Sequence, residues 1–304
     1  MNGVALFRTR KNTVCSGTDV IAFFLLLLTS LLTSAISSAA NTKASKHSIP
    51  YYEKTETILV LGAVPQEIPY LVDKLKDKKE KSLWGIPYWE GKLHGKPAVI
   101  AITGIGKTFT GMTTTLFIHH FKPRLALMTG TGARINKELR TGDVIVGTST
   151  FEHDYGSLTE NGMVYRELNG PINGAEIMNK TKTPQDLMYA AQKALKNFEP
   201  QTITIDNKSY KTKARFGIVS SSDLFGVTER RIKMLREEYN TDIMEMESAP
   251  FAHVCDFAQV PYLIVRSGSN QAQEAPNDDY LKFGPIAAKE AAKFTYQLIQ
   301  NLED

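Results

Sequence analysis

Acidic and amide side chains stand at the ends of apolar runs, where groups that do chemistry could meet. MEMES carries Glu245 and Glu247 on one side of an extended segment, because side chains alternate along a strand. Buried acids need partners, and a pair of vicinal hydroxyls is a natural partner for a carboxylate. The alternative for Glu247, and for Glu67 after the first apolar run, is an acid in the first turn of a helix.

Two further strand ends carry polar or small residues. RSGSNQ places Arg266, Ser269 and Asn270 directly after an apolar run. TGTGAR places Thr131 and Gly132 where the chain could closely approach a sugar or a base. These residue types predict a ligand site without indicating which ligand binds there.

Common cofactor motifs are absent. AITGIGKT resembles a P-loop, but Ala101 replaces the first glycine and no Walker-B partner is evident, so a tight turn at a helix N-terminus is the plainer interpretation. TGTGAR lacks the third glycine of a dinucleotide fingerprint, since position 135 is Ile. No set of His, Cys, Asp or Glu has metal-ligand spacing, so we expect neither a metal nor another cofactor.

Strand-like and helix-like patterns alternate along the chain. Strands are predicted near residues 57–64, 87–93, 97–103, 125–132, 142–154, 214–220 and 261–269, with a short strand running into a helix within 241–259. Helices are predicted near 67–79, 107–120, 184–197, 227–238 and 278–302, and the lysines of KLKDKKEK fit an exposed helix end. This order predicts a mixed, mostly parallel sheet with helices on both faces.

In such sheets ligands bind beyond the carboxyl ends of the strands. The strand ends GAVPQE, TGIGK, TGTGAR, MEME and RSGSNQ should therefore converge on one side of the sheet.

The N-terminal 40 residues have the pattern of a secretory signal. Basic residues in FRTRKN precede a short apolar stretch and small residues, and cleavage after Ala39 or Ala40 would fit; an uncleaved membrane anchor is the alternative. Residues 41–54 read as a polar linker and 55–304 as one domain, secreted or periplasmic. Cleavage would leave Cys255 as the only cysteine, and the net charge of +4 is too small to indicate nucleic-acid binding.

Taken together and in order, the motifs resemble those of 5′-methylthioadenosine/S-adenosylhomocysteine nucleosidases of the purine nucleoside phosphorylase superfamily. LGAVPQEI, GKLHGKPAVIAITGIGK, KPRLALMTGTGA, GIVSSSDLF, MEMESAPFAHVC and VPYLIVRSGSN carry the resemblance over about residues 57–300. It implies a three-layer α/β/α nucleoside phosphorylase-like fold, hydrolysis of a purine nucleoside without a cofactor, and a homodimer, because the related nucleosidases complete each site with residues of a neighbouring subunit.

The resemblance also implies roles for individual residues. Glu67 would activate the attacking water, Thr131 and Gly132 would lie near the ribose, and Met246 and Glu247 would hold it. Phe225 would stack on the base, and Arg266 and Ser269 match the arginine and serine of the family's last strand. Glu245 is the other acid of the MEME segment.

Asn270 departs from the family pattern, which has a catalytic aspartate here. A carboxylic acid can donate a proton to purine N7, which is general acid catalysis, whereas an amide can only form hydrogen bonds. Three interpretations follow: an altered base preference, since 6-oxopurines need less help to leave; a weakly active or inactive nucleoside-binding or storage protein; or replacement of the acid by a neighbour such as Glu274.

Whether water or phosphate is the nucleophile depends on whether the site has cationic side chains that can bind phosphate. Phosphorylases of the superfamily hold phosphate with arginines, one of them just before the third strand's end, where this chain has Met128. Arg134 lies beyond the loop, and Glu67 would repel phosphate. The sequence therefore favours hydrolysis, with a phosphate-dependent phosphorylase as an alternative.

Overall fold

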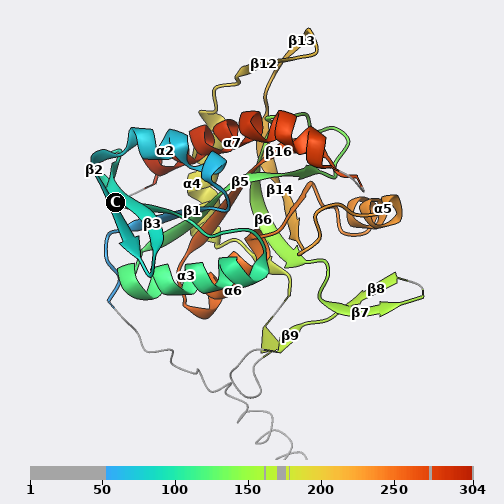
Figure 1. Ribbon diagram of the computed structural model, residues 1–304, viewed down its shortest axis with the longest axis horizontal. Helices are drawn as coiled ribbons and strands as arrows, with labels where there is room; N and C mark the ends of the chain where they lie inside the picture. Colours follow the sequence, from blue (N-terminus) through green and yellow to red (C-terminus); the bar gives the residue numbers. More distant parts are fainter. Residues whose placement is uncertain (1–52, 161, 170–175, 178, 274–275, 303–304) are drawn as a thin grey trace, which may run out of the picture. The chain divides into compact units, whose positions relative to one another are not determined.

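The strand β1 (Ile58–Gly62) is buried at every position because helices cover both of its faces. The computed structural model describes residues 53–160, 162–169, 176–177, 179–273 and 276–302 (Figure 1). Ile58 and Val60 join one hydrophobic cluster, and Leu59 and Leu61 join another on the opposite face. An apolar run without alternation is thus the signature of a strand between two helical layers.

The sheet has the predicted mixed character. Its order is β11 (Thr181–Lys182), β6 (Val144–Glu152), β14 (Ala214–Ser221), β15 (Ile243–Glu245), β5 (Leu125–Arg134), β1, β4 (Lys96–Ile102), β3 (Ile86–Leu93) and β2 (Lys76–Leu83). The last strand, β16 (Tyr262–Gln271), pairs in parallel with β5 and antiparallel with β6. Since β14 joins β6 to β15, and β15 pairs back to β5, these strands close into a ring.

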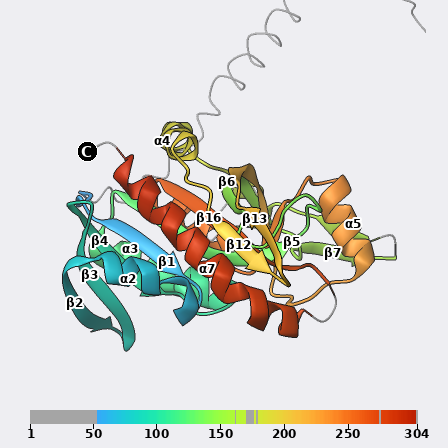
Figure 2. The same ribbon diagram turned by 90° about the horizontal axis from the view of Figure 1, so that it is seen from above.

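The helices form the outer two layers. The helices α2 (Pro69–Lys74), α4 (Gln185–Lys196) and α7 (Asn277–Gln300) cover one face, and Figure 2 shows α7 running across the sheet. The other face carries α3 (Lys107–Phe121) and α6 (Ser248–Phe257). The short α5 (Glu229–Glu237) packs through Ile232 and Leu235 on a third cluster beside the ring. The predicted α/β/α layering is confirmed.

The helix predicted over 67–79 is wrong in its second half. A 3₁₀ turn (Pro65–Glu67) is followed by α2, which ends at Lys74. The next element is β2, an exposed edge strand. Trp84 and Gly85, with φ of 53° and 82°, make the tight turn into β3. The KLKDKKEK lysines therefore lie mostly on a strand edge, where charge discourages pairing with another sheet.

Small hairpins project from the main body and were not predicted. They are formed by β7 (Gly156–Thr159) with β8 (Gly162–Tyr165) and by β12 (Thr202–Ile205) with β13 (Lys208–Lys211), and the two-residue strands β9 (Leu168–Asn169) and β10 (Glu176–Ile177) also pair (Figure 1). Their runs are too short and polar to show a clear period. The signal segment 1–40, most of the linker and Glu274 lie outside the described residues. Within the described part of the chain, no helix has the length and apolarity needed to span a membrane.

Candidate active site

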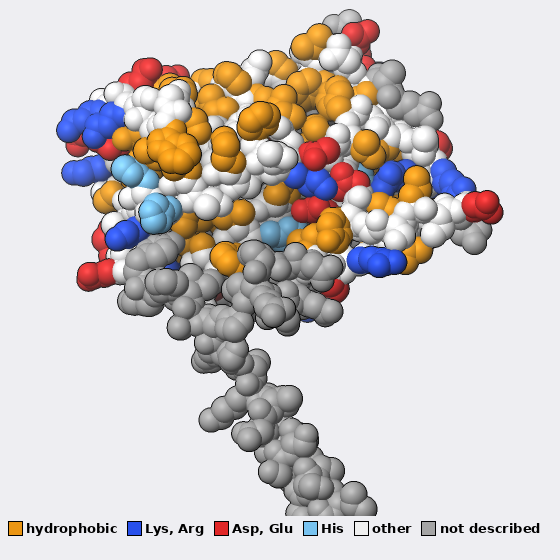
Figure 3. Space-filling view, turned by 60° about the horizontal axis from the view of Figure 1, so that its bottom comes forward, with side chains coloured by type: hydrophobic (Ala, Val, Ile, Leu, Met, Phe, Trp, Pro, Cys, Tyr) orange, Lys and Arg blue, Asp and Glu red, His pale blue; other side chains and the backbone are white. Residues whose placement is uncertain are grey.

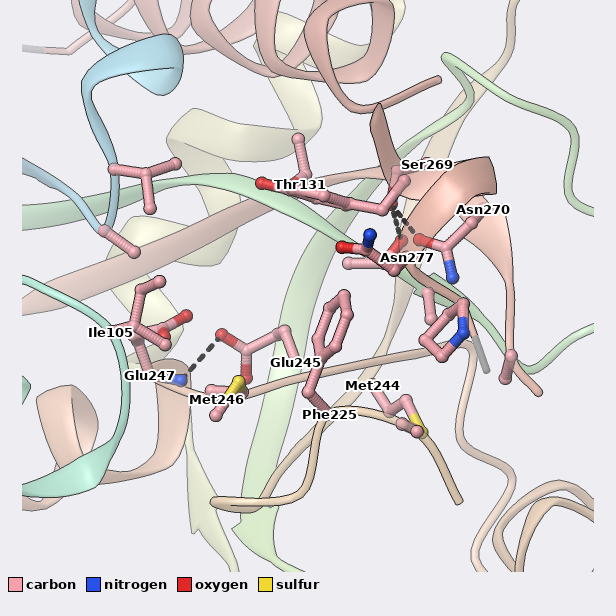
Figure 4. Close-up of a pocket in the computed structure, with 18 of the residues that line it drawn as sticks. Ile105, Thr131, Phe225, Met244, Glu245, Met246, Glu247, Ser269, Asn270 and Asn277 are labelled. Atoms are coloured by element: carbon pink, nitrogen blue, oxygen red, sulfur yellow. Dashed lines mark hydrogen bonds between the residues drawn. The ribbon is translucent and has the colours of Figure 1, made fainter. Parts of the chain in front are cut away.

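The strand ends that the sequence singled out converge on one cavity of about 440 Å³ (Figure 4). Its wall includes residues from the ends of β1, β5, β15 and β16, from the loop before α3, and from the first turns of α7. All of the predicted site residues except Arg266 line it: Glu67, Thr131, Gly132, Phe225, Glu245, Met246, Glu247, Ser269 and Asn270.

Glu67 is held by the turn that follows β1. Its Oε2 accepts a hydrogen bond from the Ala63 amide at 2.7 Å, and its Oε1 accepts from the Thr131 amide at 2.8 Å and the Thr131 hydroxyl at 3.1 Å. A Cβ on Gly130 would lie 2.5 Å from this Oε1, so only glycine lets the carboxylate approach β5 this closely. The buried carboxylate is fixed, and it faces a cavity.

Arg266 does not line the cavity; it lies behind the wall as the counterion of the acids. Its fully buried guanidinium forms an ion pair with Glu245 and lies 3.6 Å from Glu247 Oε2 and 4.0 Å from Glu67 Oε1. Burial works to lower the pKa of Arg266, but the surrounding carboxylates raise it further, so the net shift is upward. The cation is therefore permanent, and it reaches a ligand only through the acids it pairs with.

The two acids of MEME have different tasks. The Glu245 carboxylate accepts hydrogen bonds from the Glu247 amide at 3.0 Å and the Ser248 amide at 2.9 Å, and from the Ser221 hydroxyl. Glu247 is the N-cap residue of α6, but the carboxylate that accepts from the amides at this helix N-terminus is that of Glu245.

The Glu247 side chain lines the cavity wall. Its Oε1 accepts a hydrogen bond from the Gly106 amide at 3.0 Å. Burial, followed by the charge of Glu245, raises the pKa of Glu247 to about 8, against the opposing effect of Arg266.

Ser269 and Asn270 lie at an irregularity of β16. The register against β5 shifts between Gly268 and Gln271, and both side chains are buried although they are neighbours in sequence. The Ser269 hydroxyl lies 2.9 Å from Asn270 Oδ1, and Asn270 Nδ2 donates to the Gln271 carbonyl at 3.0 Å. Since that carbonyl can only accept, it sets the orientation of the amide.

The opposite side of the cavity is aromatic and apolar. Phe225 is 53% exposed and meets the ring of Tyr280 edge-on at 5.8 Å between centroids. Burial, followed by the charge of Glu67, raises the pKa of Tyr280, whose hydroxyl bonds the side chain of Thr131. Tyr280 and Asn277 of α7 line the cavity without any sequence signal, whereas Ile105 falls in the strand end TGIGK.

Comparisons with known proteins identify the family. The phosphorylase superfamily model matches residues 57–300. A 5′-methylthioadenosine/S-adenosylhomocysteine nucleosidase of Psychromonas ingrahamii is 29% identical over 244 residues, 80% of this chain and 98% of the relative.

Solved structures of similar proteins agree. The Neisseria meningitidis nucleosidase of the same name, in complex with methylthio-immucillin-A, has a TM-score of 0.70 and 27% identity, covering 82% of this chain and 100% of that one. The Helicobacter pylori futalosine hydrolase has a TM-score of 0.69 and 26% identity, covering 81% and 98%.

The fold and the matched residues place the protein in a class of α/β/α proteins with a nucleoside phosphorylase-like sheet. The chain belongs to the phosphorylase superfamily. The resemblance to 5′-methylthioadenosine/S-adenosylhomocysteine nucleosidases that its motifs predicted is confirmed.

Proposed function

We propose that the protein hydrolyses the N-glycosidic bond of a purine nucleoside. The observation that carries this proposal is the meeting of Glu67, Glu247 and Asn270 in one cavity, at the positions that match the nucleosidase motifs. The nucleosidases named above, with which the chain shares its fold, support the same reaction class.

Glu67 acts on the nucleophile. Its carboxylate is fixed by backbone amides on two sides, so it can orient a water molecule and accept a proton as the water attacks C1′. The C1′–N9 bond breaks, and its electron pair leaves with the purine. The departing base takes its proton from solvent, because Asn270 has none to give.

Glu247 and Met246 hold the ribose. Carboxyl oxygens suit the vicinal hydroxyls, and the acids around Arg266 lie where positive charge develops on the sugar. Preorganised negative groups stabilise such a charge more strongly in a buried site than in water. Met246 lines the cavity beside these acids and supplies an apolar contact to the sugar.

Phe225 and Asn270 receive the base. The phenyl ring offers a face for stacking, and the Asn270 amide has one N–H and one oxygen lone pair beyond its contacts with Ser269 and Gln271. The amide therefore binds the purine edge by hydrogen bonds, without acting as an acid.

Water is favoured over phosphate by the charges at the cavity. Among the described residues that line it, there is no lysine or arginine to bind a phosphate dianion. Met128 is fully buried in the core, and Arg134 donates to the Leu139 carbonyl at 3.1 Å instead of reaching the cavity.

Asn270 also favours a second candidate, a nucleoside-binding protein with little activity. The two are separated by incubating the purified protein with methylthioadenosine, adenosylhomocysteine, adenosine and inosine, with and without phosphate, and following the free base. Phosphate-independent release is the expected result. Release only with phosphate would point to a phosphorylase, and binding without release to the binding protein.

We also propose a homodimer. Ile105 in the loop before α3 and Phe109 and Met112 on α3 are about half exposed, and Leu224 and Phe225 add apolar surface at the cavity mouth. Figure 3 shows hydrophobic side chains gathered on the face toward α3 and α6. Such a patch favours a protein interface. Sedimentation of a monomer at micromolar concentration would contradict the proposal.

Secretion remains a proposal that rests on residues 1–40. Cell fractionation with N-terminal sequencing tests this proposal. We expect a mature protein that begins near residue 40 and lies outside the cytoplasm. An intact N-terminus would instead support the uncleaved membrane anchor.

A further inference from the structure

The P-loop-like segment TGIGKT has donors that a phosphate would occupy in a P-loop, but here the protein's own acids take them. The Gly106 amide donates to Glu247 at 3.0 Å, and the Lys107 amide donates to Asp223 Oδ1 at 2.8 Å. Asp223 thus caps α3 from a distant loop, where a negative charge is favourable. Gly106, with φ of 89°, brings the loop so close that a Cβ would lie 2.9 Å from this oxygen.

The Lys107 ammonium ties the same loop to a third segment. It donates to Glu152 Oε2 at 2.9 Å and to Asp154 Oδ1 at 2.8 Å. Asp154 in turn accepts from the Asp223 amide at 2.9 Å. The Lys107 side chain is 22% exposed and those of Glu152 and Asp154 are 9% and 17% exposed, so solvent screens these pairs only partly. Burial lowers the pKa of Lys107, but the two acids outweigh it and raise the pKa overall.

Two of the three joined segments line the candidate site. Ile105 and the amide that bonds Glu247 come from the loop before α3. Leu224 and Phe225 directly follow Asp223. None of Lys107, Asp154 and Asp223 lines the cavity. These three residues are therefore placed to set the distance between the Glu247 carboxyl group, which faces the ribose, and the Phe225 ring, which faces the base.

We propose that Lys107 is a positioning residue for nucleoside binding, which holds Glu247 and Phe225 in register through Asp154 and Asp223. The proposal rests on the proposed function, because it assigns ribose and base to those two side chains. The hydrogen bonds of Glu247 to the ribose hydroxyls and the stacking of Phe225 on the base are made in the bound substrate as well as in the transition state. Losing the link through Lys107 weakens these contacts and should therefore raise KM more than it lowers kcat.

The test compares Lys107→Met, Lys107→Arg and Asp223→Ala in the full chain. We expect Lys107→Met to raise KM by about 10-fold with kcat within about 3-fold, and Lys107→Arg, which keeps the cation, to recover most of the affinity. Asp223 is exposed, so Asp223→Ala should fold normally and raise KM in the same direction.

The matched control is Lys293→Met. Lys293 pairs with the buried Glu290 at 2.8 Å on α7 and is 29% exposed, yet it does not line the cavity. The Lys293→Met variant should lower the melting temperature about as much as Lys107→Met does but leave KM unchanged.

The outcomes separate the two proposals. If the wild type cleaves nucleosides and the Lys107 and Asp223 variants keep its KM, or if Lys293→Met raises KM equally, the positioning role is refuted and the function stands. If the wild type binds without cleaving, the same comparison is made with the Kd for adenosine by calorimetry. If the wild type neither binds nor cleaves, the function and the positioning role both fall.

Discussion

Replacing Asn270 with aspartate should give the site the acid that its sequence lacks. Asn270 is 2% exposed, its Oδ1 lies 2.9 Å from the Ser269 hydroxyl, and its Nδ2 lies 3.0 Å from the Gln271 carbonyl. In Asn270→Asp one carboxyl oxygen keeps the contact with Ser269, and the other takes the place of Nδ2. An ionised oxygen would be repelled by the carbonyl, whereas a protonated one would donate to it in the free protein and would turn its O–H to purine N7 when a nucleoside binds.

Burial and the carbonyl therefore both favour the protonated carboxyl group, which raises its pKa. A proton donor at N7 is worth about 10²–10⁴-fold in rate. Since the amide already donates a hydrogen bond, we expect the lower end, about 10²-fold in kcat for adenosine, which corresponds to about 2.7 kcal/mol. Inosine should gain less, because a 6-oxopurine leaves more readily.

The assay follows adenine and hypoxanthine release by the wild type and by Asn270→Asp, each between pH 5 and 9. The variant's activity should fall as pH rises through the pKa of the introduced carboxyl group. Asn270→Ala serves as the control that lacks both donor and acid. Adenine release that is unchanged or lower in Asn270→Asp, with the melting temperature and nucleoside Kd preserved, would refute this account of position 270.

Two further predictions concern the acids. Glu67→Gln keeps the shape but cannot take the proton of water, so kcat should drop by about 10²-fold or more while nucleoside Kd changes little; retained kcat would exclude Glu67 as the base. Glu247 has a pKa of about 8 in the folded protein and 4.5 as its ordinary value, so its contribution to stability is full below pH 4.5 and is lost as pH rises through 8. Glu247→Gln should therefore gain in melting temperature relative to the wild type between pH 5 and 9, and parallel melting curves across that range would contradict the shift.

Much of the fold could be predicted because its buried strands have unbroken apolar runs. The strands predicted near 87–93 and 97–103 are found, joined by a turn at His94 and Gly95, and so is the short strand that leads into α6. β2 could not be predicted, since every residue before Leu83 is exposed and the strand shows neither apolar alternation nor β-branched residues. Its identity depends on pairing with β3, which is a tertiary property.

The candidate site was predictable where motifs stand at strand ends. Glu67 and Asn270 lie together because the parallel strands β1, β5 and β16 bring their carboxyl ends to one edge. Glu247 joins them because β15 pairs antiparallel with the end of β5. The burial of Arg266 behind the acids was not foreseen, because spacing says nothing about depth. Tyr280 was missed because it reaches the cavity from a helix whose period gives no reason to single it out.

The division of charge inside the cavity bears on how such a site can change over evolutionary time. Glu67, Glu245 and Glu247 share one buried cation, so altering any one of them disturbs the balance of all. The side-chain hydrogen bonds of Asn270 involve the Ser269 hydroxyl and the Gln271 carbonyl and none of these acids, so an exchange between amide and acid leaves the ion pairs of Arg266 intact. Single substitutions at position 270 can therefore change the reactivity toward the base, while the three glutamates on the sugar side cannot be replaced one at a time without leaving a buried charge unbalanced.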